Sequence, residues 1–462
     1  MNQLLNPLLV GKIIKTYMVD LNRVKRLSEE KIRRYQERVL LKVIRYAYKV
    51  PLYNKKYKQV GIHPDDIKTV DDVKKIPFVT KKEFRESKPE DLIPVGEKPG
   101  KYSMVSTSGS TGQPVTLYID LHSMFYTLVG FVRIIREHGI RWNKTRIAVV
   151  ADLSPDSSEA RHLSIDALPR LKKILPLKNF GVFHVGEKPE RLIKQIEEFN
   201  PEFIGAYPGI LRILAILKRK GLGRRLEPRI LATSGAILDD YTRGYIEKSF
   251  NAKVFDVYGA TECSPIAFQC KNGNYHIMSD FAYVEFVDAQ EKEEISGDGG
   301  NIVVTRLFGR GTPVVRYTGI SDFVLPSSRR CNCGVNTPLI EKIEGRRVDS
   351  IVLPSGELVP PSSITGIPHK VMHMLNTDKI QQFQIIQQSL DEIDVFIVVD
   401  KALRNVEPRV EKISEKLKEE FARKLGDDIK INIVEVDEIK EKRPGSISPP
   451  PVVISKVKPD SK

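Results

Sequence analysis

Apolar positions recur at helical spacing near the start of the chain. The apolar side chains that share this spacing are Ile32, Tyr35, Val39, Leu40, Val43, Ile44 and Ala47. Residues three, four and seven positions apart lie on one face of a helix, so Arg33, Arg34, Arg38 and Lys42 fall on its polar faces. Prolines from Pro51 to Pro94 interrupt the rest of this region. We therefore expect the first hundred residues to form a mainly helical lead-in.

After about residue 100, short strand-like runs alternate with helical segments. "TRIAVVADL" (145–153) and "EPRILATSG" (227–235) are rich in strand-forming residues and end in small polar ones. Phe203–Ala206 reads as a short strand before a helix that begins near Pro208 and stops at Gly221. This alternation predicts a largely parallel sheet with helices on its faces. Ligands in such sheets bind at the carboxyl ends of the strands.

A second unit begins near residue 345. "QQFQIIQQ", "EIDVFIVVD", a charged segment at about 408–425 and "IKINIVEV" predict the order strand, strand, helix, strand. The tail from Lys440 is rich in proline and lysine and predicted to be extended. A chain of 462 residues exceeds what one core usually supports. We therefore predict an α/β fold with a large N-terminal domain (1–344, with 1–100 as its lead-in) and a small α+β domain (345–462).

Composition and charge narrow the function classes. With 41% hydrophobic and 29% charged residues the chain is typical of globular proteins. No apolar run approaches the roughly 18 to 20 residues of a membrane-spanning helix, and the start lacks the order of a signal peptide. We expect a cytoplasmic location.

The net charge of +15 is concentrated near the start, where residues 1–60 hold 15 Lys and Arg against 4 Asp and Glu. A solvated helix face explains this surplus better than a nucleic-acid or anionic membrane surface, so we do not expect nucleic acid as a partner, and membrane-surface contact stays the weaker alternative. The apolar stripe of Leu4, Leu5, Leu8 and Leu9 suits core packing or a homodimer better than a membrane.

A glycine-rich stretch, "STSGSTGQP" (106–114), is the first candidate binding loop. It lacks the Gly-Lys-Ser/Thr ending of a Walker A loop, and its flanks "KYSMV" and "VTLYI" favour strands. The loop is thus predicted to join two strands. Gly109 and Gly112 can adopt positive φ, so backbone N–H groups and hydroxyls could surround phosphate oxygens. A flexible polar loop without a ligand is the alternative.

Further polar motifs follow at the ends of strand-like runs. In "DVYGATECSP" (256–265), Tyr258 offers a flat face for a base, Thr261 a phosphate contact and Glu262 a magnesium ligand. A strand-end turn with an exposed glutamate would also explain this stretch. Asp322 could accept two hydrogen bonds from a ribose diol, and Arg346 could pair with ribose or phosphate.

In this order and spacing, the motifs resemble the phenylacetate–coenzyme A ligase branch of the adenylate-forming enzymes. The resemblance also includes "VIRYAYKVPLYNKKY" and "VDDVKKIPFVTKKEF" and covers nearly the whole chain. It implies an ATP-dependent, AMP-forming acid–coenzyme A ligase. Such enzymes use Mg-ATP to convert a carboxylic acid to acyl-AMP and pyrophosphate, and then transfer the acyl group to the thiol of coenzyme A.

The resemblance also implies a role for each motif. The loop expected to hold the β- and γ-phosphates comprises Ser106, Thr107, Ser108, Gly109, Ser110, Thr111 and Gly112. The adenine would lie between the "TSGA" turn, with Ser234, Gly235 and Ala236, and the Tyr258–Gly259 segment. Thr261 and Glu262 are the expected catalytic residues, at the α-phosphate and Mg²⁺. Asp322 would bind the ribose, Arg346 the ribose or phosphate region, and Tyr207, Pro208 and Gly209 would border an acyl pocket that permits an aryl group.

The C-terminal end departs from the family pattern. A Gly-Lys pair is expected there, yet Ser446 follows Gly445, and the nearest candidate lysines are Lys440, Lys442 and Lys456. Two alternatives to the ligase therefore stay open: AMP transfer to an acceptor other than coenzyme A, and a nucleotide-binding protein without catalysis. The family's hinge between domains corresponds to Asp349, with Val348 as the alternative.

All four cysteines lie between residues 263 and 333. In a cytosolic chain, clustered cysteines favour a metal over a disulfide. The predicted ligands of a structural, tetrahedral zinc site are Cys270, His276, Cys331 and Cys333. Cys263 directly follows Glu262 and is not predicted to bind the metal, and free buried thiols are the alternative. His369 and His373 are interpreted as surface or packing residues.

Overall fold

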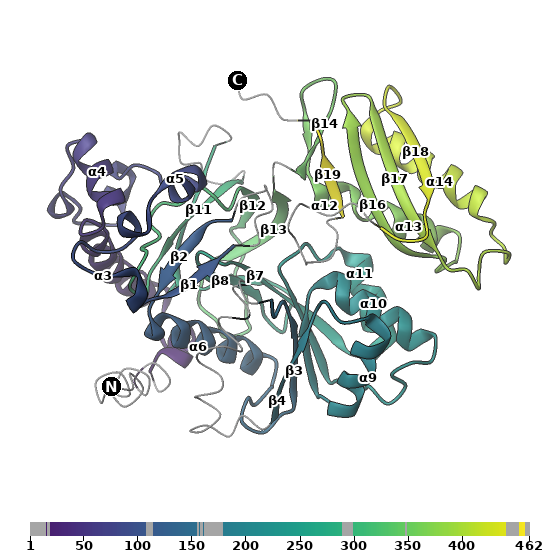
Figure 1. Ribbon diagram of the computed structural model, residues 1–462, viewed down its shortest axis with the longest axis horizontal. Helices are drawn as coiled ribbons and strands as arrows, with labels where there is room; N and C mark the ends of the chain where they lie inside the picture. Colours follow the sequence, from purple (N-terminus) through teal and green to yellow (C-terminus); the bar gives the residue numbers. More distant parts are fainter. Residues whose placement is uncertain are drawn as a thin grey trace.

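A mixed β-sheet lies at the centre of the computed structural model, which describes residues 15, 19–107, 114–154, 157, 160, 179–288, 299–346, 349–439 and 452–457 (Figure 1). The described residues contribute eleven strands to it, in the order β10-β11-β12-β13-β9-β8-β7-β6-β5-β3-β4. They are β3 (Ile147–Ala151), β4 (Phe180–His184), β5 (Phe203–Ala206), β6 (Ile230–Ser234), β7 (Lys253–Ala260), β8 (Ser264–Gln269), β9 (Tyr275–Ile277), β10 (Ala282–Val287), β11 (Gly300–Arg306), β12 (Asp322–Ser327) and β13 (Leu339–Arg346).

The strand pairing in the large sheet changes from parallel to antiparallel at β7. Strands β4, β3, β5, β6 and β7 pair in parallel, as predicted from the alternation of strands and helices. From β8 onward the pairing is antiparallel, so the prediction of a largely parallel sheet holds for one half only. Only residues 261–263 separate β7 from β8, which is too short for the crossover that a parallel pair requires.

Helices cover both faces of the parallel half. Successive strand residues point to opposite faces, and the two cores follow this alternation. Phe203, Ala232 and Phe255 pack with α6 (Leu121–Glu137), whereas Ile204, Leu231 and Val254 pack with α9 (Pro189–Phe199), α10 (Pro208–Arg219) and α11 (Asp240–Phe250). The predicted strand at 203–206 and the helix that begins at Pro208 are both confirmed.

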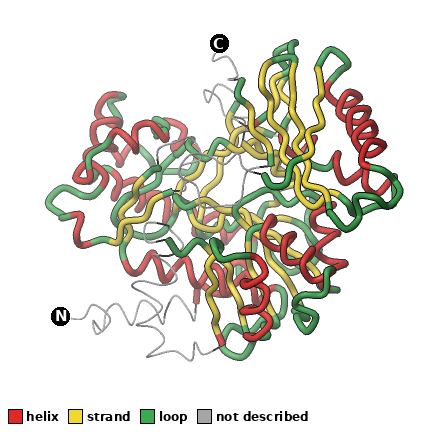
Figure 2. Tube along the Cα trace, turned by 45° about the vertical axis from the view of Figure 1, so that its right-hand side comes forward, coloured by secondary structure: helices red, strands yellow, loops and turns green. Residues whose placement is uncertain are grey.

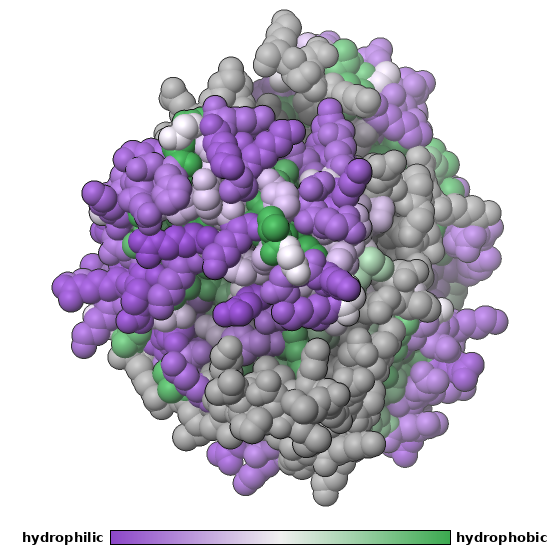
Figure 3. All heavy atoms as spheres, turned by 60° about the vertical axis from the view of Figure 1, so that its left-hand side comes forward, coloured by the Kyte–Doolittle hydropathy of each residue, from purple (hydrophilic) through white to green (hydrophobic). Residues whose placement is uncertain are grey.

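The N-terminal region is helical, as predicted. Its elements are η2 (Asp20–Asn22), α2 (Arg23–Arg26), α3 (Glu29–Ala47), α4 (Pro51–Gln59), η3 (Pro64–Asp66), η4 (Asp71–Lys75), α5 (Lys81–Glu86), η5 (Pro89–Leu92) and η6 (Pro99–Lys101). Thr80 caps α5 in a capping box with Glu83, which satisfies backbone N–H groups at the helix start. In α3 the apolar face packs on the core, while Arg33, Arg34, Arg38 and Lys42 are exposed. The side of the molecule that carries these helices is mainly hydrophilic (Figure 3).

A smaller α+β unit follows the large sheet. It contains β14 (Ile351–Val352), β15 (Leu358–Val359), α12 (Pro361–Ile364), α13 (Ile367–Met374), β16 (Ile380–Ser389), β17 (Glu392–Val399), α14 (Val410–Leu425), β18 (Lys430–Glu435) and β19 (Val453–Ser455). The predicted order strand, strand, helix, strand is confirmed, with the sheet order β18-β17-β16-β19. Figure 2 shows this sheet and its long helix beside the large sheet. The predicted domain boundary, between residues 344 and 345, falls within β13, which continues to Arg346. The position of this boundary stays a prediction.

Polar contacts join the smaller unit to α10 and α11. Arg212 on α10 donates from Nε to the carbonyl of Gln381, at 3.1 Å, and from Nη2 to that of Ile380, at 3.2 Å. His369 stacks on Tyr241, with 3.3 Å between ring centroids, and its Nδ1 lies 3.3 Å from Asp239 Oδ1. Burial lowers the pKa of His369 to about 4, so the ring is neutral here.

Among the described residues no helix is long and apolar enough to cross a membrane.

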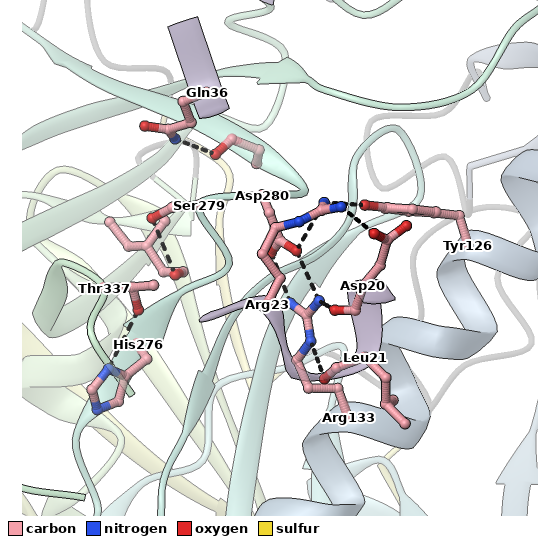
Figure 4. A network of polar contacts seen from close by, with 12 residues as sticks. Asp20, Leu21, Arg23, Gln36, Tyr126, Arg133, His276, Ser279, Asp280 and Thr337 are labelled. Atoms are coloured by element: carbon pink, nitrogen blue, oxygen red, sulfur yellow. Dashed lines mark hydrogen bonds and ion pairs between the residues drawn. The ribbon is translucent and has the colours of Figure 1, made fainter. Parts of the chain in front are cut away.

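A buried ionic network ties the start of the described chain to the core (Figure 4). Arg133 on α6 donates to both carboxylate oxygens of Asp280, at 2.7 and 2.8 Å, and these side chains are 2% and 0% exposed. The same guanidinium donates to the carbonyls of Asp20 and Leu21. Arg133 thereby holds the N-terminal segment against the sheet.

Removing one member of this pair should be strongly destabilising. Asp280→Ala leaves the Arg133 guanidinium buried without its counter-ion, so we expect the free energy of unfolding to fall by about 3–5 kcal/mol in urea denaturation. Arg34→Ala, which breaks the exposed pair with Glu30 on α3, is the control and should have little effect. If both changes lowered the free energy of unfolding by the same small amount, Arg133 would not require Asp280 as its counter-ion.

Candidate active site

The glycine-rich stretch lies between two paired strands, as predicted. β1 (Ser103–Ser106) and β2 (Thr116–Ile119) pair antiparallel, with Ser106 opposite Thr116. Thr107 closes the base of the loop, because its N–H donates to the Val115 carbonyl and its Oγ1 accepts from the Val115 N–H, each at 2.9 Å. Ser108, Gly109, Ser110, Thr111 and Gly112 lie outside the described residues. Phosphate binding by this loop stays a prediction.

The "YGATE" segment forms the turn between β7 and β8. A side chain at Gly259 would place its Cβ 2.8 Å from the carbonyl oxygen of Ser264, so the turn can be this tight only with glycine. Thr261 is half-buried in this turn. Glu262 is buried, with 5% of its surface exposed, which is at odds with the alternative of an exposed glutamate.

Two side chains that sequence reasoning missed hold Glu262 in place. Tyr317 donates its hydroxyl proton to Glu262 Oε1, at 2.9 Å. Arg306, the last residue of β11, donates from Nη1 to the Glu262 carbonyl at 3.2 Å and from Nη2 to the Thr312 carbonyl at 2.6 Å. Both residues are 40 or more positions away in the chain, and the sequence carries no local signal of these contacts. The backbone and the carboxylate of Glu262 are therefore fixed separately.

Tyr258, Asp322 and Arg346 come together at one edge of the sheet. The Tyr258 hydroxyl donates to Asp322 Oδ2 at 2.8 Å, and Asp322 pairs with Arg346 across β12 and β13. Burial raises the pKa of Asp322, and the positive charge of Arg346 and the Tyr258 hydrogen bond act against this rise. Tyr258 and Asp322 thus form one rigid pair, next to the turn that carries Thr261 and Glu262.

The "TSGA" turn follows β6 and is open to solvent. Ser234, Gly235 and Ala236 are exposed, whereas Thr233 is buried and donates its hydroxyl proton to Asp256. Asp256 also accepts a hydrogen bond from the Tyr275 hydroxyl, at 2.6 Å. The carboxyl ends of the neighbouring strands β5, β6 and β7 therefore bring the "AYPG", "TSGA" and "YGATE" motifs to one edge, where ligands of such sheets bind.

The predicted acyl-pocket residues border this turn. Gly235 has φ +83°, and a Cβ there would lie 2.8 Å from the ring of Tyr207, so the ring packs directly on this glycine. Tyr207 precedes α10, and Pro208 occupies the first turn of that helix, followed by the half-buried Gly209. The structure therefore brings the predicted adenine turn and the predicted acyl pocket into contact.

The four predicted metal ligands meet in space. Cys270 follows β8, His276 lies on β9, and Cys331 and Cys333 lie between β12 and β13; their ligand atoms are all within 4.8 Å of one another. Cys270 Sγ lies 3.7 Å from Cys331 Sγ, and Cys333 Sγ lies 3.3 Å from His276 Nε2. His276 Nδ1 lies 3.4 Å from the Thr337 hydroxyl, which leaves Nε2 for the thiols.

Three sulfurs and one imidazole nitrogen suit tetrahedral Zn²⁺, and a hydrogen bond at the other ring nitrogen is typical of a metal-binding histidine. Cys263 is fully buried in the hydrophobic core and is not part of this group.

The candidate residues near the C-terminus are only partly described. Lys456 follows β19 and is exposed, and its backbone N–H donates to the Gln387 carbonyl at 3.0 Å. Lys440, Lys442 and the Gly445–Ser446 pair lie outside the described residues, as does Val348. Asp349, the predicted hinge residue, directly follows this gap after β13. Of the two histidines, His369 packs between the units as described above, and His373 is exposed.

Comparisons with known proteins show which families this chain resembles. Residues 355–449 match the family described as the CapK C-terminal domain. A phenylacetate-coenzyme A ligase of Aromatoleum evansii is 28% identical over 355 residues, which cover 74% of this chain and 76% of the relative. Protein CapK of Staphylococcus aureus is 23% identical over 333 residues, which cover 72% and 70%.

Solved structures share the fold over most of this chain. 2-Hydroxyisobutyryl-CoA ligase in the postadenylation state, in complex with 2-HIB-AMP, has a TM-score of 0.74 at 20% identity, covering 88% of this chain and 86% of that chain. The same ligase with 2-HIB-AMP and CoA in the thioesterification state has a TM-score of 0.61 at 20% identity, with 93% and 91% covered.

The metal site can be tested directly. We expect elemental analysis of the purified protein to give close to one zinc per chain, and the double change Cys331→Ser/Cys333→Ser to abolish it, since two of four ligands are lost. Cys263→Ala, outside the cluster, should keep the zinc. Full metal content in the double variant would exclude this ligand set.

Proposed function

We propose that this chain, which is similar to phenylacetate–coenzyme A ligases, is an AMP-forming acid–coenzyme A ligase that acts on an aryl acid. In the first step the carboxylate attacks the α-phosphorus of ATP, giving acyl-AMP and pyrophosphate. In the second step the thiol of coenzyme A attacks the acyl carbon, and AMP leaves. The proposal includes the cytoplasmic location expected from the sequence.

One observation carries this proposal: a single edge of the large sheet gathers the motifs from β5, β6, β7 and β12. The exposed "TSGA" turn offers a surface for the adenine, and the Tyr258–Asp322 pair lies within hydrogen-bonding distance at 2.8 Å. Asp322 would accept hydrogen bonds from the ribose hydroxyls, and Arg346 would contact the ribose or a phosphate. Thr261 would contact the α-phosphate, and the loop from Ser106 to Gly112 would hold the β- and γ-phosphates.

Glu262 fits a magnesium ligand. Its Oε1 is engaged by Tyr317, which leaves the second oxygen of a fixed carboxylate for the metal. Bound there, Mg²⁺ would neutralise charge on the phosphate oxygens, as it does in phosphoryl-transfer sites. The rigidity of this carboxylate favours catalysis, because preorganised groups need no rearrangement as charge develops.

The aryl preference rests on two lines of support. The relative from Aromatoleum evansii is named for phenylacetate, and the ring of Tyr207 lies directly against Gly235 at the edge of the proposed nucleotide site. An aromatic side chain can pack on an aryl group face to face or edge to face, which is worth about 0.5–1.5 kcal/mol beyond the buried area. An aliphatic acid would lack this contribution.

The Cys₃His cluster has a separate, structural role in the proposal. All four positions of a tetrahedral ion would be filled by protein atoms, which leaves no position for a reactant. The cluster joins the β8–β9 turn to the segment between β12 and β13. These are the strands that carry the Tyr275 hydroxyl to Asp256 and place Asp322 beside Tyr258. Zinc would thus stabilise the antiparallel half that completes the site.

The proposed function predicts acid-dependent exchange of pyrophosphate into ATP. With a panel of aryl and aliphatic acids, we expect exchange that requires an acid and is faster with aryl acids, followed by thioester formation when coenzyme A is added. Nucleotide binding without exchange under every acid would contradict the ligase. Exchange without thioester formation would favour AMP transfer to another acceptor.

Replacing Glu262 tests the site itself. Glu262→Gln keeps the size of the side chain but removes its charge, so we expect Mg²⁺-dependent exchange to fall by 100-fold or more, on the order of 3 kcal/mol of transition-state stabilisation. Glu344→Gln, a buried glutamate on β13, is the matched control and should retain exchange. Unchanged exchange in Glu262→Gln would remove this residue from the mechanism.

A further inference from the structure

Tyr317 is a buried tyrosine in the segment between β11 and β12. Its side chain is 0% exposed. Its backbone is held by two hydrogen bonds with Val304 of β11: the Tyr317 N–H donates to the Val304 carbonyl at 3.0 Å, and the Val304 N–H donates to the Tyr317 carbonyl at 3.1 Å. The neighbouring Arg316 forms a buried ion pair with Glu285, at 2.8 Å. The position of the Tyr317 ring is therefore set by the sheet.

The N-terminal lead-in supports the same ring from the other side. Phe84 on α5 stacks on Tyr317, with 5.1 Å between ring centroids and 23° between ring planes. Val79 forms a parallel bridge with Tyr317, and the Thr318 N–H donates to the Val79 carbonyl at 3.1 Å. Phe84 thus packs on the ring, while Val79 and Val304 hold the backbone that carries it.

The hydroxyl of this fixed ring meets Glu262. The distance from the Tyr317 hydroxyl to Glu262 Oε1 is 2.9 Å, that of a good hydrogen bond, and Glu262 itself is 5% exposed. Arg306 holds the Glu262 carbonyl but does not reach its carboxylate. Among the described residues, the Tyr317 hydroxyl is therefore the contact that orients the carboxylate.

We propose that Tyr317 is a positioning residue, which holds the Glu262 carboxylate so that its free oxygen faces the magnesium of Mg-ATP. This inference rests on the proposed function. A hydrogen bond to one oxygen leaves the other to bind a metal, and Mg²⁺ requires ligands in near-ideal octahedral geometry. Groups that orient a metal-binding carboxylate typically change metal affinity or activity by about 10- to 100-fold when they are removed.

The same contacts give the lead-in a role in the reaction. Residues 79–84 lie far from Glu262 in the sequence, yet Phe84 packs on the ring whose hydroxyl contacts Glu262. Loosening Phe84 should therefore weaken metal binding at Glu262 without any change at Glu262 itself. A residue with a purely structural role would lower stability and leave the metal dependence unchanged.

The experiment measures the binding of Mn²⁺, in place of Mg²⁺, to the full-length protein in the presence of ATP, by electron paramagnetic resonance. Tyr317→Phe removes one hydroxyl and keeps the ring, so we expect Mn²⁺ affinity to fall about 10- to 100-fold. Tyr57→Phe is the matched control, since the Tyr57 hydroxyl is buried and has no hydrogen-bond partner among the described residues. We expect wild-type affinity in that variant.

Two outcomes would overturn the proposal: wild-type Mn²⁺ affinity in folded Tyr317→Phe, or equal affinity in the wild type and Glu262→Gln. Should Tyr317→Phe fail to fold, Phe84→Leu keeps the hydroxyl and trims the ring support. Weakened Mn²⁺ affinity in Phe84→Leu supports the proposal, and unchanged affinity overturns it. A different result would contradict the proposed function. In that case the wild-type protein would still bind Mn²⁺ and ATP through Glu262 but would show no pyrophosphate exchange.

Discussion

The tight turn between β7 and β8 is the constraint on which the rest of the structure depends. Three residues, 261–263, reverse the chain direction, and the close approach of Gly259 to the Ser264 carbonyl permits this only without a side chain. The reversal ends the parallel half of the sheet at the edge where β5, β6 and β7 present their carboxyl ends. It also begins the antiparallel half, which returns through β13 and β12 and delivers Arg346 and Asp322 to that edge.

Tyrosine hydroxyls hold the carboxylates around this turn. Tyr317 binds Glu262, Tyr258 binds Asp322 and Tyr275 binds Asp256, at 2.9, 2.8 and 2.6 Å. A neutral hydroxyl satisfies one carboxylate oxygen and orients the group. Unlike a lysine or an arginine, it does not neutralise the negative charge of the carboxylate. Burial raises the pKa of Tyr258 well above that of a free tyrosine, so its hydroxyl keeps the proton that it donates. Under the proposed function, the charge of Glu262 would serve the metal and Asp322 would serve the ribose.

How much of this the sequence predicts depends on the range of the contacts. The strand at Phe203–Ala206 and the helix at Pro208 follow local rules of strand propensity and proline placement, and both were predictable. The cysteine cluster was predictable from residue types alone. The contacts of Tyr317 and Arg306 with Glu262 were not, because they join segments 55 and 44 positions apart through sheet pairing. The edge strand β19 was missed for the same reason, since its partner β16 lies more than sixty residues earlier.

Charge around the nucleotide site explains why the smaller unit matters. Two buried arginines lie near the turn. Arg306 donates from Nη1 and Nη2 to the carbonyls of Glu262 and Thr312, and Arg316 forms an ion pair with Glu285. Neither can move to a phosphate without leaving a buried partner unsatisfied. In the proposed reaction, the charge on the α-phosphate would therefore be met by other groups, such as Mg²⁺, Arg346 or a lysine from the smaller unit. That unit meets α10 and α11 through Arg212, His369 and Tyr241, and Tyr241 packs against the cores on both sides of this contact. In the proposed reaction, a lysine from the smaller unit would meet charge on the α-phosphate as the carboxylate attacks.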